Sequence, residues 1–132
     1  MTLFVDASAL VAIIAGEDDR DNLLDRLALD DDALWSAMSC WETVSSLRNS
    51  RRFDTSMARR EAEQTALDLG LRLVSAGAAE LRIALDAYER YGKGSRHPAK
   101  LNMGDCFAYA CAKTNGARLL YKGEDFIHTD LG

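Results

Sequence analysis

Apolar residues follow two patterns that alternate along the chain, short continuous runs and helical repeats. The continuous runs predict buried strands, and they cover residues 2–6, 33–35, 71–75 and 118–121. The helical repeats predict helices over residues 7–15, 18–29, 38–51, 55–70, a segment that ends at Gly92, and 104–115. Strand and helix therefore alternate, with no internal repeat and no linker between them.

This alternation predicts an α/β fold with a mainly parallel central sheet of four to five strands. Parallel neighbours need crossover connections, and strands that are apolar on both sides need helices on both faces of the sheet. A length of 132 residues is the usual size of one domain, so we expect residues 1–132 to form a single one. In such folds ligands bind beyond the carboxyl ends of the strands.

The periodicity also predicts which helix faces are buried. Large apolar residues recur every third or fourth position in two helices, with Met38, Trp41 and Val44 in the first and Leu81, Leu85 and Tyr88 in the second. We expect both stripes to face the core. Thr55 or Ser56 is the expected cap of the helix over residues 55–70.

Charge is distributed unevenly around a net value of −5. Residues 1–32 hold nine acids and two bases, whereas the remainder holds slightly more bases than acids. Five arginines lie within thirteen residues that contain one acid, namely Arg48, Arg51, Arg52, Arg59 and Arg60. This patch suits phosphate oxygens, or it is the solvated face of two helices. The overall acidity argues against a nonspecific coat for duplex DNA, but not against a nuclease whose metal brings positive charge.

The cysteine content and the apolar runs indicate a reducing compartment away from the membrane. Cys40, Cys106 and Cys111 form no CxxC pair, so neither a disulfide framework nor a zinc ribbon is expected. The longest apolar run, residues 9–15, is far shorter than the roughly 18 residues of a spanning helix. We therefore expect a cytoplasmic protein without a signal peptide, a membrane anchor or a membrane partner.

Four acids stand where an apolar element begins, ends or turns, and they are Asp6, Glu42, Asp105 and Asp125. Asp6 also suits a helix N-cap, and Asp105 also suits the positive end of a helix dipole. Glu42 borders a buried stripe without a Lys or Arg three or four residues away, so its carboxylate needs a partner from elsewhere in the fold. A metal ion is one such partner.

Carboxylates that meet at one edge of a sheet repel one another until a divalent cation offsets their charge. Ligation by oxygen alone selects Mg²⁺ or Mn²⁺, and such ions activate water for phosphodiester hydrolysis. Glu124 and Asp125 both follow the last strand. Phe126 is the one large apolar group available to anchor this loop, which favours the adjacent Asp125 over Glu124 as the fourth acid.

Other chemistries lack their residues. His97 and His128 have no HExxH or CxxC neighbour, so zinc is not expected, and no GxSxG, GxxxxGK[ST] or GxGxxG sequence is present. Residues 92–98 include Lys93, Arg96 and His97 and predict either a mobile basic loop at the mouth of the site or a plain connection.

Three stretches resemble PIN-domain proteins, and specifically the VapC-type toxins of bacterial toxin–antitoxin pairs. The first two are Phe4-Val-Asp6-Ala-Ser8-Ala-Leu and Ser39-Cys-Trp-Glu42. The third comprises Leu101-Asn-Met-Gly-Asp105-Cys-Phe-Ala-Tyr-Ala, then Leu119-Leu-Tyr-Lys-Gly-Glu-Asp125-Phe and Thr129-Asp-Leu. The resemblance spans nearly the whole chain, although residues 48–92 match only in length and helicity.

The resemblance implies a PIN-like three-layer sandwich and a metal-dependent endoribonuclease, the toxin of a type II toxin–antitoxin system. It implies cleavage of structured RNA such as tRNA, leaving a 3′ hydroxyl and a 5′ phosphate. Asp6, Glu42, Asp105 and Asp125 would be the catalytic, metal-binding acids for Mg²⁺ or Mn²⁺, supported by the Ser8 hydroxyl. The implied partners are a cognate VapB-type antitoxin, whose tail covers the site, and a second copy in a homodimer.

Three other functions remain as alternatives. A noncatalytic PIN-like binding module would keep the fold, although the four intact acids count against it. A receiver-like signalling domain would need two adjacent acids after the first strand, where this chain has only Asp6. A haloacid-dehalogenase-like phosphatase would need a second Asp two residues later, and that position is Ser8.

Overall fold

The computed structural model describes residues 1–50 and 53–132, and every element expected from the apolar pattern is present in it. The four strands are β1 (Thr2–Val5), β2 (Asp32–Ser36), β3 (Leu71–Val74) and β4 (Arg118–Leu120). The six helices are α1 (Ala7–Ala15), α2 (Arg20–Ala28), α3 (Ala37–Ser50), α4 (Thr55–Asp68), α5 (Ala78–Tyr91) and α6 (Met103–Thr114). Their ends differ from the predicted ones by one or two residues.

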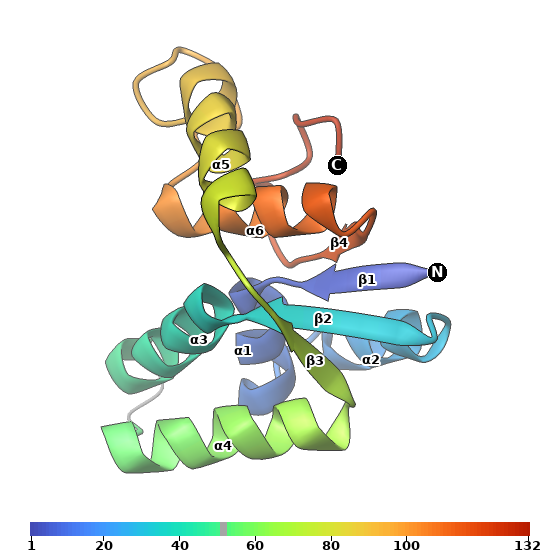
Figure 1. The fold of residues 1–132 in the computed structure, drawn as a ribbon. Coiled ribbons are helices and arrows are strands. Elements are labelled where there is room, and N and C mark those ends of the chain that lie inside the picture. The colour runs from blue at the N-terminus through green and yellow to red at the C-terminus, as the bar shows by residue number, and fades with distance from the viewer. Residues whose placement is uncertain (51–52) are drawn as a thin grey trace.

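The strands form one parallel sheet in the order β3-β2-β1-β4. Strand β1 pairs with β2 through Phe4 and Leu34, and with β4 through Phe4 and Leu119. Helices cover both faces, as Figure 1 shows, with α5 and α6 on one side and α1, α2 and α4 on the other. The predicted three-layer α/β sandwich with a parallel central sheet is therefore confirmed, with four strands.

Alternation along β1 builds the two halves of the core. Phe4 packs with residues of α5 and α6, whereas Leu3 and Val5 pack with residues of α1 and α2. All three side chains are fully buried. Successive side chains of a strand point to opposite faces, so a run without polar positions is required when both faces carry helices.

The predicted inner stripes of two helices are wrong. Leu81, Leu85 and Tyr88 of α5 are 48%, 56% and 52% exposed, and α5 buries Ala84, Ala87 and Tyr91 instead. Small side chains let α5 approach α6 closely, so the buried stripe is the one with the smaller residues.

The prediction for α3 is wrong for Trp41, which is 73% exposed, whereas Val44 is partly buried against the core. The buried stripe of α3 is Ser39, Thr43 and Leu47. The buried hydroxyls are satisfied locally: the Thr43 hydroxyl donates to the Ser39 carbonyl oxygen at 2.7 Å. Polar residues occupy this core stripe because each finds a partner within its own segment.

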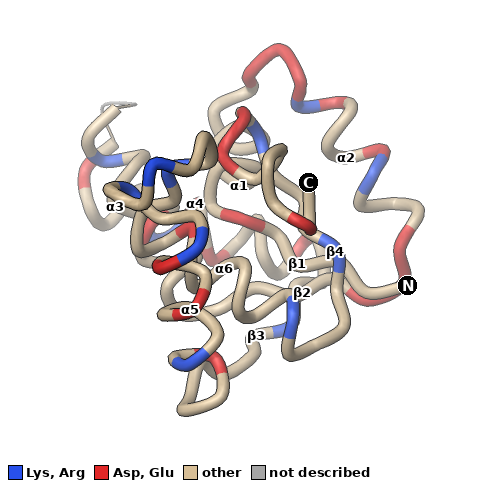
Figure 2. The backbone as a smooth tube through the Cα atoms, turned by 90° about the horizontal axis from the view of Figure 1, so that it is seen from above, with Lys and Arg blue, Asp and Glu red and all other residues tan. Residues whose placement is uncertain are grey.

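The cap of α4 is Asp54, whose carboxylate accepts a hydrogen bond from the Met57 amide at 2.8 Å, and not Thr55 or Ser56. Within the predicted arginine patch, Arg59 pairs with Glu63 and Arg48 is exposed, whereas Arg51 and Arg52 lie outside the described residues. Figure 2 shows acidic positions gathered around α2 and the neighbouring turns, and basic positions spread over α3, α4 and α5. None of the helices in the described segments is long and apolar enough to cross a membrane.

Candidate active site

The strand order places a crevice between β1 and β4. The connections from β1 to β2 and β3 run over one face of the sheet, and the connection from β3 to β4 runs over the other. Ligands in parallel sheets bind at this kind of reversal, beyond the carboxyl ends of the strands. Asp6 follows β1 and donates its amide hydrogen to the Leu120 carbonyl oxygen of β4 at 2.9 Å.

Asp6 is held by Ser8. Its Oδ2 accepts hydrogen bonds from the Ser8 amide at 3.0 Å and from the Ser8 hydroxyl at 2.6 Å. The Ser8 hydroxyl oxygen also accepts a hydrogen bond from the Lys122 amide at 3.0 Å. Asp6 is therefore the N-cap of α1, and the same bonds fix its second oxygen at the edge of the crevice.

Asp105 is held by a capping box at the start of α6. The Asp105 amide donates to the Asn102 side chain at 2.9 Å, and the Asn102 amide donates to the Asp105 carboxylate at 3.1 Å. Asp105 is 7% exposed. The reciprocal bonds use one carboxylate oxygen and position the acid at the positive end of the helix.

Glu42 reaches the site from α3 and packs against a glycine of α6. A Cβ atom added to Gly104 would lie 1.8 Å from Glu42 Oε2 and 2.5 Å from Oε1. Only a glycine leaves room for this carboxylate, since real Cβ contacts are never so short. Gly104 therefore determines where the Glu42 carboxylate lies.

The four predicted acids line one cavity of about 350 Å³. The other residues that line it are Ala7, Ser8, Val11, Glu17, Ser46, Asn102 and Lys122. Asp125 is part of this lining and Glu124 is not, which agrees with the preference for the acid next to Phe126. Phe126 is 1% exposed and contacts the Tyr121 ring edge-on at 5.1 Å between centroids.

Burial and electrostatic repulsion between the carboxylates raise the pKa of several acids in the cavity. Burial, together with the charges of Asp6 and Asp105, raises the pKa of Glu42 to about 7. Burial likewise raises the pKa of Asp105 to about 7, with Asp125 and Asp6 adding to the effect, while the Asn102 hydrogen bond and the Lys93 charge oppose it. Burial also raises the pKa of Asp6, against the hydrogen bonds from Ser8. The site therefore has excess negative charge that a cation would relieve.

Two tethers hold the segment that carries Asp125. On one side, the Lys122 ammonium lies 2.6 Å from Glu17 and 3.3 Å from Asp19, in the turn between α1 and α2. On the other side, Asp130 accepts a hydrogen bond from the Tyr109 hydroxyl at 2.6 Å and pairs with Lys113, both from α6. The segment has no regular secondary structure, so these contacts and Phe126 fix its path.

The residues present suit a hard divalent cation. All four acids offer oxygen ligands. Their carboxylates repel one another when ionised, and a bound cation would offset this repulsion. In residues 1–50 and 53–132, no three His, Cys, Asp or Glu side chains form a preformed metal cluster. Oxygen ligands of this kind suit a hard cation such as Mg²⁺ or Mn²⁺, which retains water and takes few protein ligands.

The sequence alone did not indicate Asn102, Gly104, Ser46 or Lys122 as part of the site. Asn102 is the one with a local signal, because an Asn three residues before an acid matches a capping box. Gly104, Ser46 and Lys122 enter only through the tertiary packing of α3, α6 and the segment after β4.

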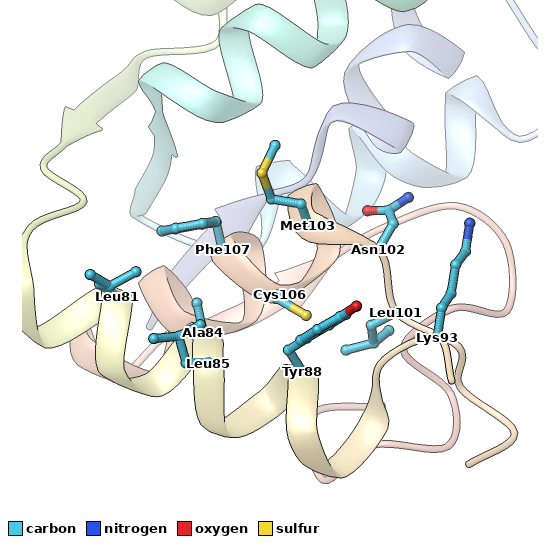
Figure 3. Close-up of a pocket in the computed structure, with 10 residues that line it drawn as sticks. All are labelled: Leu81, Ala84, Leu85, Tyr88, Lys93, Leu101, Asn102, Met103, Cys106 and Phe107. Atoms are coloured by element: carbon cyan, nitrogen blue, oxygen red, sulfur yellow. The ribbon is translucent and has the colours of Figure 1, made fainter. Parts of the chain in front are cut away.

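A second, larger hollow lies between α5 and the start of α6. It has a volume of about 410 Å³, and its lining, drawn in Figure 3, includes Tyr88, Leu101, Lys93 and Asn102. Asn102 lines both this larger hollow and the acidic cavity, so the two adjoin each other.

Comparison with known proteins places this geometry in a family. A family model described as the PIN domain matches residues 3–131. Ribonuclease VapC42 of Mycobacterium tuberculosis is 36% identical over 129 residues, covering 98% of this chain and 96% of that protein. Ribonuclease VapC30 of the same organism is 41% identical over 134 residues, covering 98% and 95%. Ribonuclease VapC of Mycolicibacterium smegmatis is 41% identical over 129 residues, covering 98% and 97%.

Solved structures share the fold. Mycobacterium tuberculosis VapC20, a toxin that cleaves the sarcin-ricin loop, superposes with a TM-score of 0.74 at 21% identity, over 97% of this chain and 95% of that one. A toxin–antitoxin complex from Klebsiella pneumoniae contains a chain with a TM-score of 0.69 at 15% identity, over 99% and 94%. The resemblance found in the sequence is confirmed: the chain belongs to the PIN-domain family and, within it, to the VapC ribonucleases.

Proposed function

We propose that this protein is a divalent-metal-dependent endoribonuclease, the toxin of a type II toxin–antitoxin pair, and that it hydrolyses phosphodiester bonds in structured RNA such as tRNA. The observation that carries this proposal is the single cavity lined by Asp6, Glu42, Asp105 and Asp125. Burial and neighbouring charges raise the pKa of two of these acids to about 7, so near neutral pH a cation would favour the fully ionised cavity.

The chain supplies the ligands and their positions. Asp6, Glu42, Asp105 and Asp125 would hold Mg²⁺ or Mn²⁺, and such an ion activates water and offsets the charge of the phosphate. Ser8 and Asn102 each bind one carboxylate oxygen of an acid and leave the other oxygen for the ion. Gly104 leaves space for the Glu42 carboxylate.

Purified protein is expected to cleave RNA when Mg²⁺ or Mn²⁺ is added and to be inactive in EDTA, because carboxylates alone do not activate water at neutral pH. The assay is gel analysis of a labelled transfer RNA transcript, with the chelator titrated by added metal. Cleavage that persists unchanged in EDTA would contradict the metal mechanism. RNA binding without cleavage in either ion would support a noncatalytic module instead.

Asp125→Asn is expected to lower kcat more than tenfold relative to Glu124→Gln at fixed Mg²⁺, because Asp125 lines the acidic cavity and Glu124 does not. Both acids are exposed and each substitution removes one charge, so the pair is matched. Initial cleavage rates and circular dichroism of both variants give the comparison. A larger loss in Glu124→Gln would reassign the fourth acid without affecting the other three.

The proposed partners are RNA, a cognate VapB-type antitoxin and a second copy of the chain, all in the cytoplasm. Large apolar side chains remain exposed beside the site, on α5 and at the start of α6, including Leu81, Leu85, Tyr88 and Met103. A patch of this kind marks an interface, and a two-fold axis would place it against itself. A homodimer would also explain why α5 carries its larger apolar residues on the outer face.

A further inference from the structure

The segment between α5 and α6, residues 92–101, concentrates positive charge next to the acidic cavity, and we call it the basic loop. Its cations are Lys93, Arg96 and Lys100, and it contains no acid. All three side chains are exposed. In the described part of the chain none of them forms an ion pair, whereas Arg72, Lys113, Arg118 and Lys122 all do.

Hydrogen bonds hold the backbone of the basic loop. Its neck is closed by backbone hydrogen bonds from Lys93 to Leu101 at 3.1 Å and from Leu101 to Tyr91 at 2.9 Å. Inside it, the Ser95 hydroxyl donates to the Gly92 carbonyl oxygen at 2.6 Å, and His97 Nδ1 accepts from the Ala99 amide at 3.1 Å. The loop therefore presents its cations on a fixed frame.

Two of these cations occupy an unfavourable backbone conformation. Arg96 has φ 66° and Lys100 has φ 51°, and they are the two non-glycine residues with positive φ among residues 1–50 and 53–132. A Cβ atom makes this region costly, and glycine would occupy it without strain. Strained positions that retain a costly side chain are typical of functional segments, because the side chain serves a ligand and not the fold.

The basic loop adjoins the cavity at Lys93. Lys93 and Asn102 both line the larger hollow drawn in Figure 3, and Asn102 also lines the acidic cavity. Lys93, Arg96 and Lys100 together line a further hollow of about 340 Å³ within the loop.

An RNA strand meets an electrostatic difficulty at this site. A cation at the four acids would offset charge near the scissile phosphate, but the flanking phosphates would still approach a cluster of carboxylates in a protein of net charge −5. Cations beside the cavity would favour the flanking phosphates and hold the strand in one direction.

We propose that the basic loop is a phosphate-binding arm for the RNA strand that flanks the scissile bond, with Arg96 and Lys100 binding successive backbone phosphates. The arm begins at Lys93, next to the acids, and leads the strand outward along the end of α5. This inference rests on the proposed ribonuclease function and adds to it the path of the substrate. Sequence-independent contacts of this kind orient RNA without selecting its bases.

The test is the double variant Arg96→Gly/Lys100→Gly, with RNA binding followed in EDTA by fluorescence anisotropy of a labelled single-stranded oligonucleotide. We expect Kd to rise about tenfold at low salt, and the slope of log K against log[salt] to fall by about 1.4, since each lost phosphate contact on a single strand accounts for about 0.7. The melting temperature should equal or exceed that of the parent, because glycine accepts positive φ. With Mg²⁺ present, KM for RNA should rise and kcat should stay within about twofold.

Two controls isolate the position of the charge. Arg96→Lys/Lys100→Arg keeps both cations and should keep the salt slope. Arg26→Ala/Arg82→Ala removes the same charge from exposed positions on α2 and α5 and should leave RNA affinity nearly unchanged. An equal loss of affinity in this second control would overturn the proposal, because net charge alone would then explain the effect.

Three further results would overturn it: a parent that does not bind the oligonucleotide, an unchanged slope in the glycine variant, or a variant that loses affinity for a polyglutamate peptide but not for RNA. The last result would assign the basic loop to an acidic protein partner.

The experiments distinguish failure of the phosphate-binding arm from failure of the ribonuclease function. If the protein cleaves RNA but the salt slope is unchanged in the glycine variant, only the phosphate-binding arm is contradicted. If the loop binds RNA in a salt-dependent way but no divalent ion supports cleavage, only the ribonuclease function is contradicted.

Discussion

Asp105→Asn is expected to lower the rate of RNA cleavage on the order of a thousandfold, because the site loses one of its metal-binding acids and the charge stabilisation that the ion provides. The substitution keeps the shape of the side chain. Its amide oxygen still accepts the hydrogen bond from the Asn102 amide, so the capping box of α6 is retained. Single-turnover cleavage at saturating Mn²⁺ measures the loss, and rates within threefold of the parent would remove Asp105 from the site.

The same variant is expected to be more stable than the parent without metal, and more so at pH 8 than at pH 5. The folded state raises the pKa of Asp105 to about 7, from its ordinary value of 3.8. Between these values the unfolded chain has released a proton that the folded protein keeps, so the parent loses stability as the pH rises through this window. Asn does not titrate, so the variant does not lose this stability as the pH rises. Thermal unfolding of both proteins in EDTA at the two pH values measures this difference in stability. A difference that is equal at pH 5 and pH 8 would contradict the raised pKa of Asp105.

Gly104→Ala is expected to reduce kcat about a hundredfold while leaving the protein folded, because the added methyl group takes the place of the Glu42 carboxylate. The new Cβ would lie 1.8 Å from Glu42 Oε2, and a flexible side chain moves away more easily than the backbone of α6. Misplacement of a catalytic group by about 1 Å is enough for a loss of this size. Alanine also favours the helix more than glycine does, so stability should change little.

A double-mutant cycle tests whether Gly104 acts through Glu42. In a Glu42→Ala background, Gly104→Ala should cost almost no further activity, because the group that it displaces is already gone. Gly77→Ala is the matched control, since its Cβ would meet Glu80 Oε1 at an ordinary 3.7 Å. Independent, additive losses at positions 42 and 104 would show that the glycine is needed for another reason.

The apolar pattern predicts the elements of this fold well but not the faces of all its helices. Continuous runs such as Leu3, Phe4 and Val5 leave no polar position for solvent, so a strand covered on both sides is the one arrangement that buries them. On α5 the pattern offers two stripes, and hydrophobicity alone favours Leu81 and Leu85. The structure buries Ala84 and Ala87, because close packing of two helices stabilises the fold in addition to the burial of apolar area.

The site is only partly visible in the sequence for a related reason. Asp6, Asp105 and Asp125 stand at element boundaries, and an element boundary can be found by reading along one segment. The contact between Glu42 and Gly104 joins α3 to α6, and no local pattern in either helix indicates it. The alternative interpretations, Asp6 as a helix N-cap and Asp105 as an acid at the positive end of a helix, are also correct. Each acid uses one oxygen for its helix and offers the other to the cavity.

The contact between Ser8 and Lys122 has a consequence for folding. These residues are 114 positions apart in sequence, and their hydrogen bond, together with the pairing of β1 and β4, closes the crevice that contains the acids. Contacts between such distant segments carry the largest loop-closure cost and tend to form late, after local helices and neighbouring strands. A chain that has formed only β1 to β3 therefore has a sheet and part of a core but an incomplete set of acids. We therefore expect nuclease activity to be the last property that this protein acquires as it folds, and the first that it loses when β4 separates from β1.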